Sequence, residues 1–174
     1  ALVWDPPNDM WSYFPNLKII QSLGAGVDHI LSKAYPKNIN IIKLSDPDLS
    51  NQMAEYLLMS VLMCYRNFFE YSNNKKNKNW KQLTPSSKQD FIITVLGYGT
   101  ISKLIVKKLI NMGFNVQVWS KTKRAPKNID YYYGDNGFHN SLKNTSCLIS
   151  LLPATSSTHN IIGLTEFNLL SKNC

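Results

Sequence analysis

Two short glycine-containing stretches, LGAGVD at 23–28 and LGYGTI at 96–101, are the first features of the sequence that could do chemistry. Each places Gly-x-Gly directly after an apolar run, where backbone N–H groups can turn toward an anion. A nucleotide-binding site needs only one such turn, so each stretch has to be assigned from its surroundings.

The second stretch lies between a predicted strand at 91–96 and a predicted helix at about 100–112. Gly113 then ends the helix and a second strand follows at 115–119, which completes the pattern of a βαβ unit. A glycine-rich turn in this setting is typical of dinucleotide binding, although a purely structural strand-to-helix turn is the alternative.

Each position of this turn has a local role in binding a pyrophosphate. Gly97 permits the tight turn, Gly99 lets the backbone approach the phosphates, and the helix that follows presents free N–H groups and the positive end of its dipole. The third position of the pattern holds Ser102 rather than Gly or Ala, which we interpret as a tolerable departure because serine is only one hydroxyl larger than alanine.

The end of the second strand indicates the type of cofactor. An NAD site usually has Asp or Glu here to accept a hydrogen bond from the ribose, but residues 120–124 read SKTKR and contain no acid. Hydroxyl and cationic side chains attract a 2′-phosphate, and each charge-assisted hydrogen bond contributes roughly 1.5–3 kcal/mol. We therefore expect NADP(H) to be preferred, with NAD(H) as a weaker alternative and a surface basic loop as the non-functional one.

The first stretch, at 23–28, does not fit the dinucleotide pattern because no helical third glycine follows it. Its successive N–H groups can still form a small concave anion site, and a carboxylate suits a site of that size. From the residues alone, a carboxylate site and an ordinary turn both remain open.

The remaining periodicity predicts an α/β fold with two Rossmann-like lobes, neither of them complete. We expect short strands at 1–4, 17–24 and 38–46, a long connector helix over about 50–73 with Ser50 as its N-cap, a linker at 84–90, a loop or short helix over 131–144, a strand at 147–153 and a helix near Leu164. The predicted domains are a partial substrate-binding lobe over 1–88, which includes the connector, and a partial NAD(P)-binding Rossmann domain over 89–174.

Composition excludes several classes of protein. The 174 residues are 44% hydrophobic and 17% charged, which favours a globular chain over a disordered one. The net charge of +8 is scattered, without basic residues interleaved with aromatics on one face, so we expect no nucleic-acid partner. Three widely spaced cysteines predict neither a disulfide framework nor a zinc site and favour the cytoplasm, and no apolar run is long enough for a membrane span.

Four motifs in order resemble the D-isomer-specific 2-hydroxyacid dehydrogenases: LGAGVDHI, NQMAEYLLMSVLMCYRNF, VLGYGTIS and LLPATSSTHNIIG. The start ALVWDPP and the strand end VWSKTKR most resemble the glyoxylate/hydroxypyruvate reductase A branch of that family. The resemblance covers essentially the whole chain. It implies a flavodoxin-like substrate lobe, a Rossmann cofactor lobe and reduction of a small 2-keto acid to a 2-hydroxy acid with NADPH.

The resemblance also implies a role for individual residues. The substrate carboxylate is expected on the backbone of Ala25, Gly26 and Val27, with Trp4 lining the pocket. The cofactor is expected to contact Gly97, Gly99, Thr100 and Ile101 at the pyrophosphate, Ser120, Lys121, Lys123 and Arg124 at the 2′-phosphate, and Leu152, Pro153 and Thr155 near the adenosine half. Met53 of the connector helix is expected near the cofactor or, equally, in the helix core.

The family's catalytic Arg, Glu and His have no matching positions in this chain, which begins within a strand pattern and stops after a helix pattern. We therefore expect no catalytic residue here: the parent protein is a reductase and the chain by itself is inert. The alternative is a non-catalytic dinucleotide-binding pseudoenzyme or corepressor-like module of the same fold. The family further suggests a homodimer. The preferred 2-keto acid does not follow from the sequence.

Overall fold

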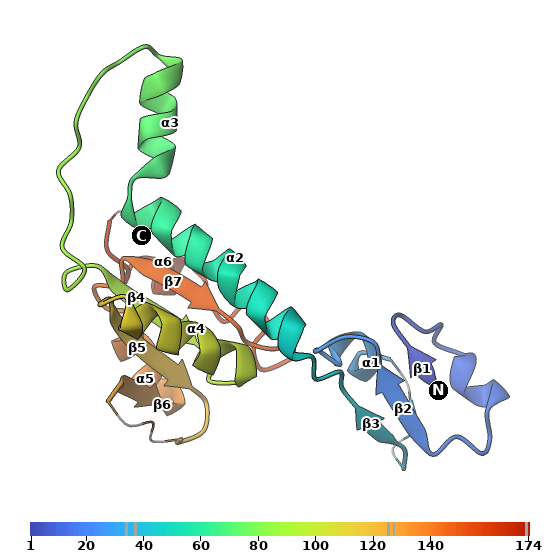
Figure 1. Cartoon of the computed structure of the whole chain (residues 1–174). Helices are drawn as coiled ribbons and strands as arrows, with labels where there is room; N and C mark the ends of the chain where they lie inside the picture. Colours follow the sequence, from blue (N-terminus) through green and yellow to red (C-terminus); the bar gives the residue numbers. More distant parts are fainter. Residues whose placement is uncertain (34, 37, 125, 127, 173) are drawn as a thin grey trace. The chain divides into compact units, whose positions relative to one another are not determined.

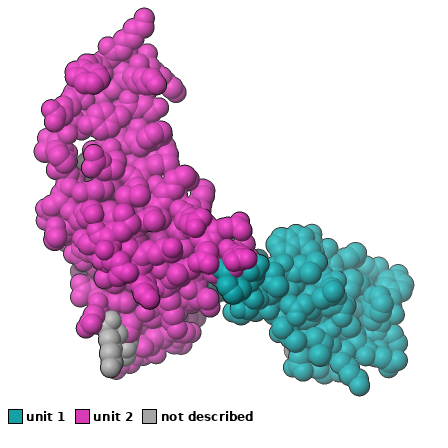
Figure 2. Space-filling model, viewed as in Figure 1, with its two compact units in different colours: residues 1–47, 153–159 teal, residues 48–152, 160–174 magenta. Residues whose placement is uncertain are grey.

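The computed structural model describes residues 1–33, 35–36, 38–124, 126, 128–172 and 174. They form two compact units: residues 1–47 with 153–159, and residues 48–152 with 160–174 (Figure 2). The predicted lobe boundary at 88/89 differs from this division, because the segment 48–88 is grouped with the second unit. The boundary stays a prediction.

The first unit is built on a parallel sheet of three strands in the order β1-β2-β3 (Figure 1). The strands are β1 (Leu2–Val3), β2 (Ile19–Ser22) and β3 (Asn40–Ile42), joined through the 3-10 helix η1 (Met10–Tyr13) and the short helix α1 (Asp28–Leu31). Its core consists of Val3, Trp11, Ile20, Ile30 and Ile39. All three strands were predicted, and each is shorter than its apolar run.

The second unit is built on a parallel sheet of four strands in the order β6-β5-β4-β7. These are β4 (Ile92–Leu96), β5 (Asn115–Ser120), β6 (Asp130–Tyr133) and β7 (Cys147–Ser150). The order places β4 between β5 and β7. The chain therefore runs outward from β4 through β5 to β6, and then crosses back to form β7 on the other side of β4. This arrangement confirms the predicted α/β fold, and its reversal point is where ligands bind in open parallel sheets.

Helices cover both faces of the four-stranded sheet, which explains why nearly every residue of β4 and β5 is buried, whichever face it points to. The first face, carrying Ile93 and Val95, packs against α2 (Pro47–Tyr65) and α4 (Thr100–Asn111). The opposite face, carrying Leu96 and Trp119, packs against α5 (Gly134–Leu142), and α6 (Leu164–Phe167) follows β7.

The expected single connector helix over 50–73 is wrong in two respects. It begins at Pro47, because proline favours the first helical position, so Ser50 lies inside the helix and is not its N-cap. It also ends at Tyr65, since Asn67 adopts a left-handed conformation with φ 53°. A separate helix, α3 (Phe68–Lys76), then begins, and none of its residues is buried.

Strand β6 was not predicted, because the tyrosine-rich segment 131–144 was interpreted as a loop or a short helix. The first residues of that segment are instead part of β6, because residues 130–133 pair with β5: Gln117 faces Asp130 and Ser120 faces Tyr133. Its edge position explains why the segment lacks a long apolar run.

In the described part of the chain, no helix combines the length and apolarity that a membrane span requires.

Candidate functional site

The turn from β4 into α4 is held in a conformation that favours glycine. Gly97 has φ +94°, and a Cβ added to it would lie 3.1 Å from the carbonyl oxygen of Leu151. Its N–H donates to the Trp119 carbonyl at 2.8 Å. The turn is therefore fixed against the ends of both neighbouring strands, β5 and β7, at the reversal point of the sheet.

Gly99 has a different reason to be glycine. Its backbone is extended, with φ −89°, and a Cβ would meet no protein atom within 4 Å. Around it, the backbone N–H groups of Tyr98, Gly99, Thr100 and Ile101 have no acceptor among the residues that the structure describes. The structure thus leaves open space and free donors at a helix N-terminus, which fits a pyrophosphate. Ser102, one turn on, is buried as the close helix–strand packing requires.

The end of β5 carries the predicted basic turn. Lys121, Lys123 and Arg124 are exposed, and the Lys123 ammonium lies 5.5 Å from the centre of the Tyr133 ring. Ser120 differs from them, since it is only 6% exposed and its hydroxyl lies 2.5 Å from the Tyr131 hydroxyl and 2.8 Å from the Thr122 carbonyl oxygen. Its direct contact with a 2′-phosphate stays a prediction, as do the contacts of the three basic residues.

The segment after β7 is ordered by hydroxyl groups. The Thr155 N–H donates to Thr158 Oγ1 at 2.9 Å, and that hydroxyl also bonds the Pro153 carbonyl. Leu152 packs against the Leu96 and Trp119 cluster on the α5 face of the sheet. Leu152 therefore belongs to the same unit as the glycine turn, whereas Pro153 and Thr155 are grouped with the first unit.

In the first unit, the loop after β2 is organised around the buried hydroxyl of Ser22. The Gly24 N–H donates to Ser22 Oγ at 3.1 Å, Ser22 Oγ donates to the Gly26 carbonyl at 3.0 Å, and His29 Nε2 lies 3.3 Å away. All three contacts are hydrogen bonds only if His29 carries a proton on Nε2 and donates it. Ser22 was not singled out from the sequence, because nothing in LGAGVD indicates what holds the loop.

This arrangement leaves the predicted carboxylate donors free. The N–H groups of Ala25, Gly26 and Val27 have no acceptor in the described part of the chain. Three successive free donors form the concave anion site that the sequence left open against an ordinary turn. A carboxylate bound there stays a prediction.

Trp4 lies beside the same loop. Its ring centre is 5.0 Å from that of His29, and the indole covers Gly24 while remaining 61% exposed. The backbone is held by strand β1 on one side and, on the other, by an ion pair of 2.6 Å between Asp5 and Lys33. The hydrogen bond from Lys33, together with its charge, lowers the pKa of the Asp5 carboxyl, so this carboxyl is ionised at neutral pH.

The three histidines lie apart from one another. His29 packs against Trp4, His139 lies 3.1 Å from Glu166 on the opposite side of the four-stranded sheet from α4, and His159 is exposed. Within the described residues, no group of three or more His, Cys, Asp or Glu side chains could hold a metal ion. Met53 is half-buried on α2.

The comparison with known families agrees with this geometry. The sequence model of the D-isomer specific 2-hydroxyacid dehydrogenases, NAD binding domain, matches residues 58–174. The chain belongs to this family. The match includes both the glycine turn and the basic strand end, and the contacts of their individual residues with a cofactor stay predictions.

Curated relatives of the reductase A branch match nearly the whole chain. Glyoxylate/hydroxypyruvate reductase A of Photorhabdus laumondii is 34% identical over 176 residues, which cover 98% of this chain and 56% of the relative. The reductase of the same name from Yersinia enterocolitica is 34% identical over 179 residues, which cover 99% and 57%. The chain thus spans little more than half the length of these relatives.

Solved structures of the 2-hydroxyacid dehydrogenase fold match equally well. A probable 2-hydroxyacid dehydrogenase from Rhizobium etli, solved with NADP, HEPES and tartaric acid, has a TM-score of 0.91 at 32% identity, covering 98% of this chain and 53% of that one. An NADPH-dependent glyoxylate/hydroxypyruvate reductase from Sinorhizobium meliloti, solved with NADP and sulfate, has a TM-score of 0.90 at 32% identity, covering 99% and 54%.

Proposed function

We propose that this chain forms part of an NADPH-dependent reductase that converts glyoxylate and hydroxypyruvate to glycolate and glycerate. The observation that carries the proposal is the open space at Gly99, which the free N–H groups of residues 98–101 border. The neighbouring strand, β5, then ends in a basic turn that contains no acidic residue. Its relatives of the reductase A branch support the choice of substrates.

In this proposal each group of residues does one thing. The N–H groups of residues 98–101 bind the pyrophosphate, and the basic turn at 121–124 neutralises the 2′-phosphate. The free N–H groups of residues 25–27 orient the 2-keto acid by its carboxylate, while Trp4 limits the space beside it. The bound nicotinamide supplies the hydride for the reduction.

The proton for the product hydroxyl comes from outside these residues. None of the three histidines lies among the free donors of the second unit, and His29 uses Nε2 to support the loop that carries the carboxylate donors. We therefore expect the family's Arg, Glu and His to be supplied by sequence that these 174 residues do not include.

The direct test is a spectrophotometric assay of the full-length protein, following NADPH oxidation with glyoxylate, hydroxypyruvate and pyruvate. We expect turnover with the first two and a dissociation constant for NADPH at least ten-fold below that for NADH. NADPH binding without oxidation by any 2-keto acid supports the non-catalytic dinucleotide-binding module instead. Failure to bind either cofactor overturns both.

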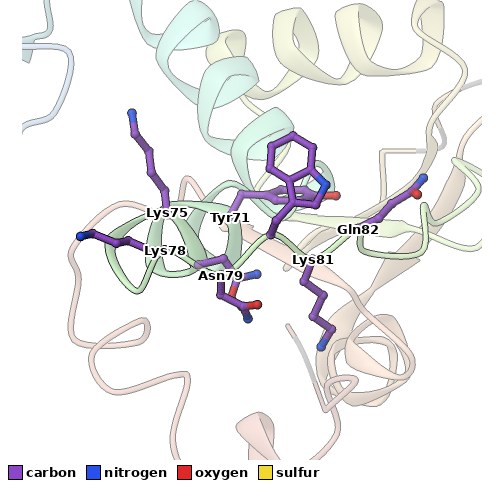
Figure 3. A pocket seen from close by; sticks show the side chains of 8 residues that line it. Tyr71, Lys75, Lys78, Asn79, Lys81 and Gln82 are labelled. Atoms are coloured by element: carbon purple, nitrogen blue, oxygen red, sulfur yellow. The ribbon is translucent and has the colours of Figure 1, made fainter.

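The protein is further proposed to be a homodimer through the arm formed by α3 and the segment that follows it. Exposed aromatic side chains gather there, including Phe68, Phe69 and a fully exposed Trp80. Trp80 and Tyr71 line a hollow on the arm (Figure 3), and the Leu83 N–H donates to the Tyr71 hydroxyl at 3.1 Å. A nine-residue helix without a buried residue gains little stability alone, so a covering surface is expected.

Sedimentation equilibrium of the full-length protein tests the assembly. We expect a dimer that Phe69→Glu or Trp80→Glu weakens, and a matched control, Phe14→Glu in the first unit, that leaves it intact. A monomeric wild-type protein overturns this part of the proposal.

The three free cysteines suit a reducing cytoplasm, where we propose that the enzyme works.

A further inference from the structure

Three oxygen atoms meet behind the basic turn at the end of β5. The Ser120 and Tyr131 hydroxyl oxygens are 2.5 Å apart, and the Thr122 carbonyl oxygen lies 2.8 Å from the first and 2.7 Å from the second. Tyr131 comes from β6, the strand that pairs with β5, and it faces Val118 in that pairing. A residue from the next strand therefore reaches back to the turn.

The number of protons shared by these three oxygen atoms limits which hydrogen bonds they can form. Two hydroxyl groups supply two protons for three short contacts, and the carbonyl supplies none. The 2.5 Å contact must carry one proton, because two bare hydroxyl oxygens repel at that distance. The other proton then goes to the Thr122 carbonyl, donated by either hydroxyl. Either side chain alone can therefore still hold that carbonyl.

The Thr122 carbonyl is a sensitive point for the basic turn. It belongs to the peptide unit between Thr122 and Lys123, so fixing this oxygen orients the backbone directly at Lys123 and restrains the turn one residue after Lys121. Lys123 is held further by the Tyr133 ring, which stacks on the Tyr131 ring at 6.4 Å. The ring of Tyr98, from the glycine turn, also lies 6.4 Å from the Tyr131 ring, centre to centre.

We propose that Tyr131 and Ser120 together position the basic turn at 121–124 for the 2′-phosphate, and so set the preference for NADPH over NADH. Both act as positioning residues through the Thr122 carbonyl, and Ser120 is not itself a phosphate ligand. Preorganising flexible cations lowers the entropy lost when they bind a phosphate, so the gain applies to NADPH and leaves NADH unaffected. This inference rests on the proposed NADPH-dependent function.

The test is to measure dissociation constants for NADPH and NADH by titration calorimetry on the full-length protein. The variants are Tyr131→Phe, Ser120→Ala and the double variant, with Tyr132→Phe as a matched control, since Tyr132 packs with the Leu96 and Trp119 cluster on the α5 face and its hydroxyl has no hydrogen bond among the described residues. Each single variant keeps one donor, so we expect its NADPH preference to fall by about 3-fold or less.

The double variant leaves the Thr122 carbonyl without a donor, so its NADPH preference is expected to fall at least about 10-fold, with the NADH constant unchanged within about 2-fold. The control keeps the wild-type preference. This non-additive loss, confined to NADPH, is the signature of a shared positioning role, because a general loss of packing weakens both cofactors.

Other outcomes overturn the inference. A wild-type protein without preference for NADPH overturns the proposed function and this inference together. A wild-type preference that survives in the double variant overturns the inference alone. The same holds if both cofactors weaken equally, or if Ser120→Ala by itself produces the full loss while Tyr131→Phe is neutral, since that pattern makes Ser120 a direct ligand.

Discussion

The indole of Trp4 occupies the space that a side chain at position 24 would need. A Cβ built on Gly24 would lie 2.4 Å from Cζ3 of the ring, far inside van der Waals contact. The same ring lies against His29, which is bonded to Ser22 at the base of the loop. Trp4, which borders the proposed substrate site, and the loop that carries the carboxylate donors thus pack directly against each other.

Gly24→Ala should displace the indole and weaken substrate binding. The backbone at position 24 accepts alanine, so the clash is relieved by movement of the ring. We expect KM for glyoxylate to rise about 10-fold, equivalent to about 1.4 kcal/mol, while NADPH affinity stays the same. Steady-state kinetics of the full-length enzyme measure both quantities.

The control for this change is Gly137→Ala within α5, where the added Cβ meets Tyr132 at an ordinary 3.4 Å. In a Trp4→Leu background, Gly24→Ala should have little further effect, because the clashing ring is gone. An equal rise in KM in both backgrounds contradicts a mechanism that acts through Trp4.

The two glycines of the cofactor turn should respond differently to alanine. Gly97→Ala places a Cβ at positive φ and against the Leu151 carbonyl, so we expect a loss of at least about 1 kcal/mol of unfolding free energy. Gly99→Ala meets no protein atom and should leave stability within about 0.5 kcal/mol, yet weaken NADPH about 10-fold or more. Urea unfolding and calorimetry separate the two effects, and an unchanged NADPH affinity in Gly99→Ala contradicts the placement of the pyrophosphate.

Reversing the charge at Lys121 should abolish the preference for NADPH. Lys121→Asp removes one charge-assisted contact and adds repulsion, so we expect NADPH to bind at least about 10-fold more weakly and NADH to bind no worse. Lys107→Asp, on the exposed side of α4, makes the same change in net charge and should leave the ratio intact. A similar shift in both variants points to long-range charge rather than to contact with the 2′-phosphate.

Cys147 should contribute to the loss of stability at high pH. Burial on β7 raises the pKa of its thiol from 9.0 to about 12, so the folded state keeps a proton that the unfolded chain releases above pH 9. This stability is fully present below pH 9 and is lost as pH rises toward 12. Between pH 7.5 and pH 10, the free energy of unfolding of wild type should fall by up to about 1.4 kcal/mol more than that of Cys147→Ala, as measured by urea titration. Equal losses in both proteins exclude this contribution.

The sequence alone predicted the βαβ unit because its signals are local. The strand at 92–96, the helix at 100–111 and the glycines between them lie within about twenty residues and follow clear periodicities. Strand β6 escaped prediction because its conformation depends on pairing with β5, and the connector helix was misjudged because a single left-handed Asn67 divides it.

The sequence by itself determined the family, the fold class and the residue types available to a dinucleotide and a carboxylate. Only the tertiary structure decided what holds those residues in place. The hydroxyl of Ser22 beneath the first glycine loop, and that of Tyr131 behind the basic turn, act across gaps of 4 to 11 residues or between strands. Such contacts leave no periodic pattern in the chain, because they depend on where separate segments meet after folding.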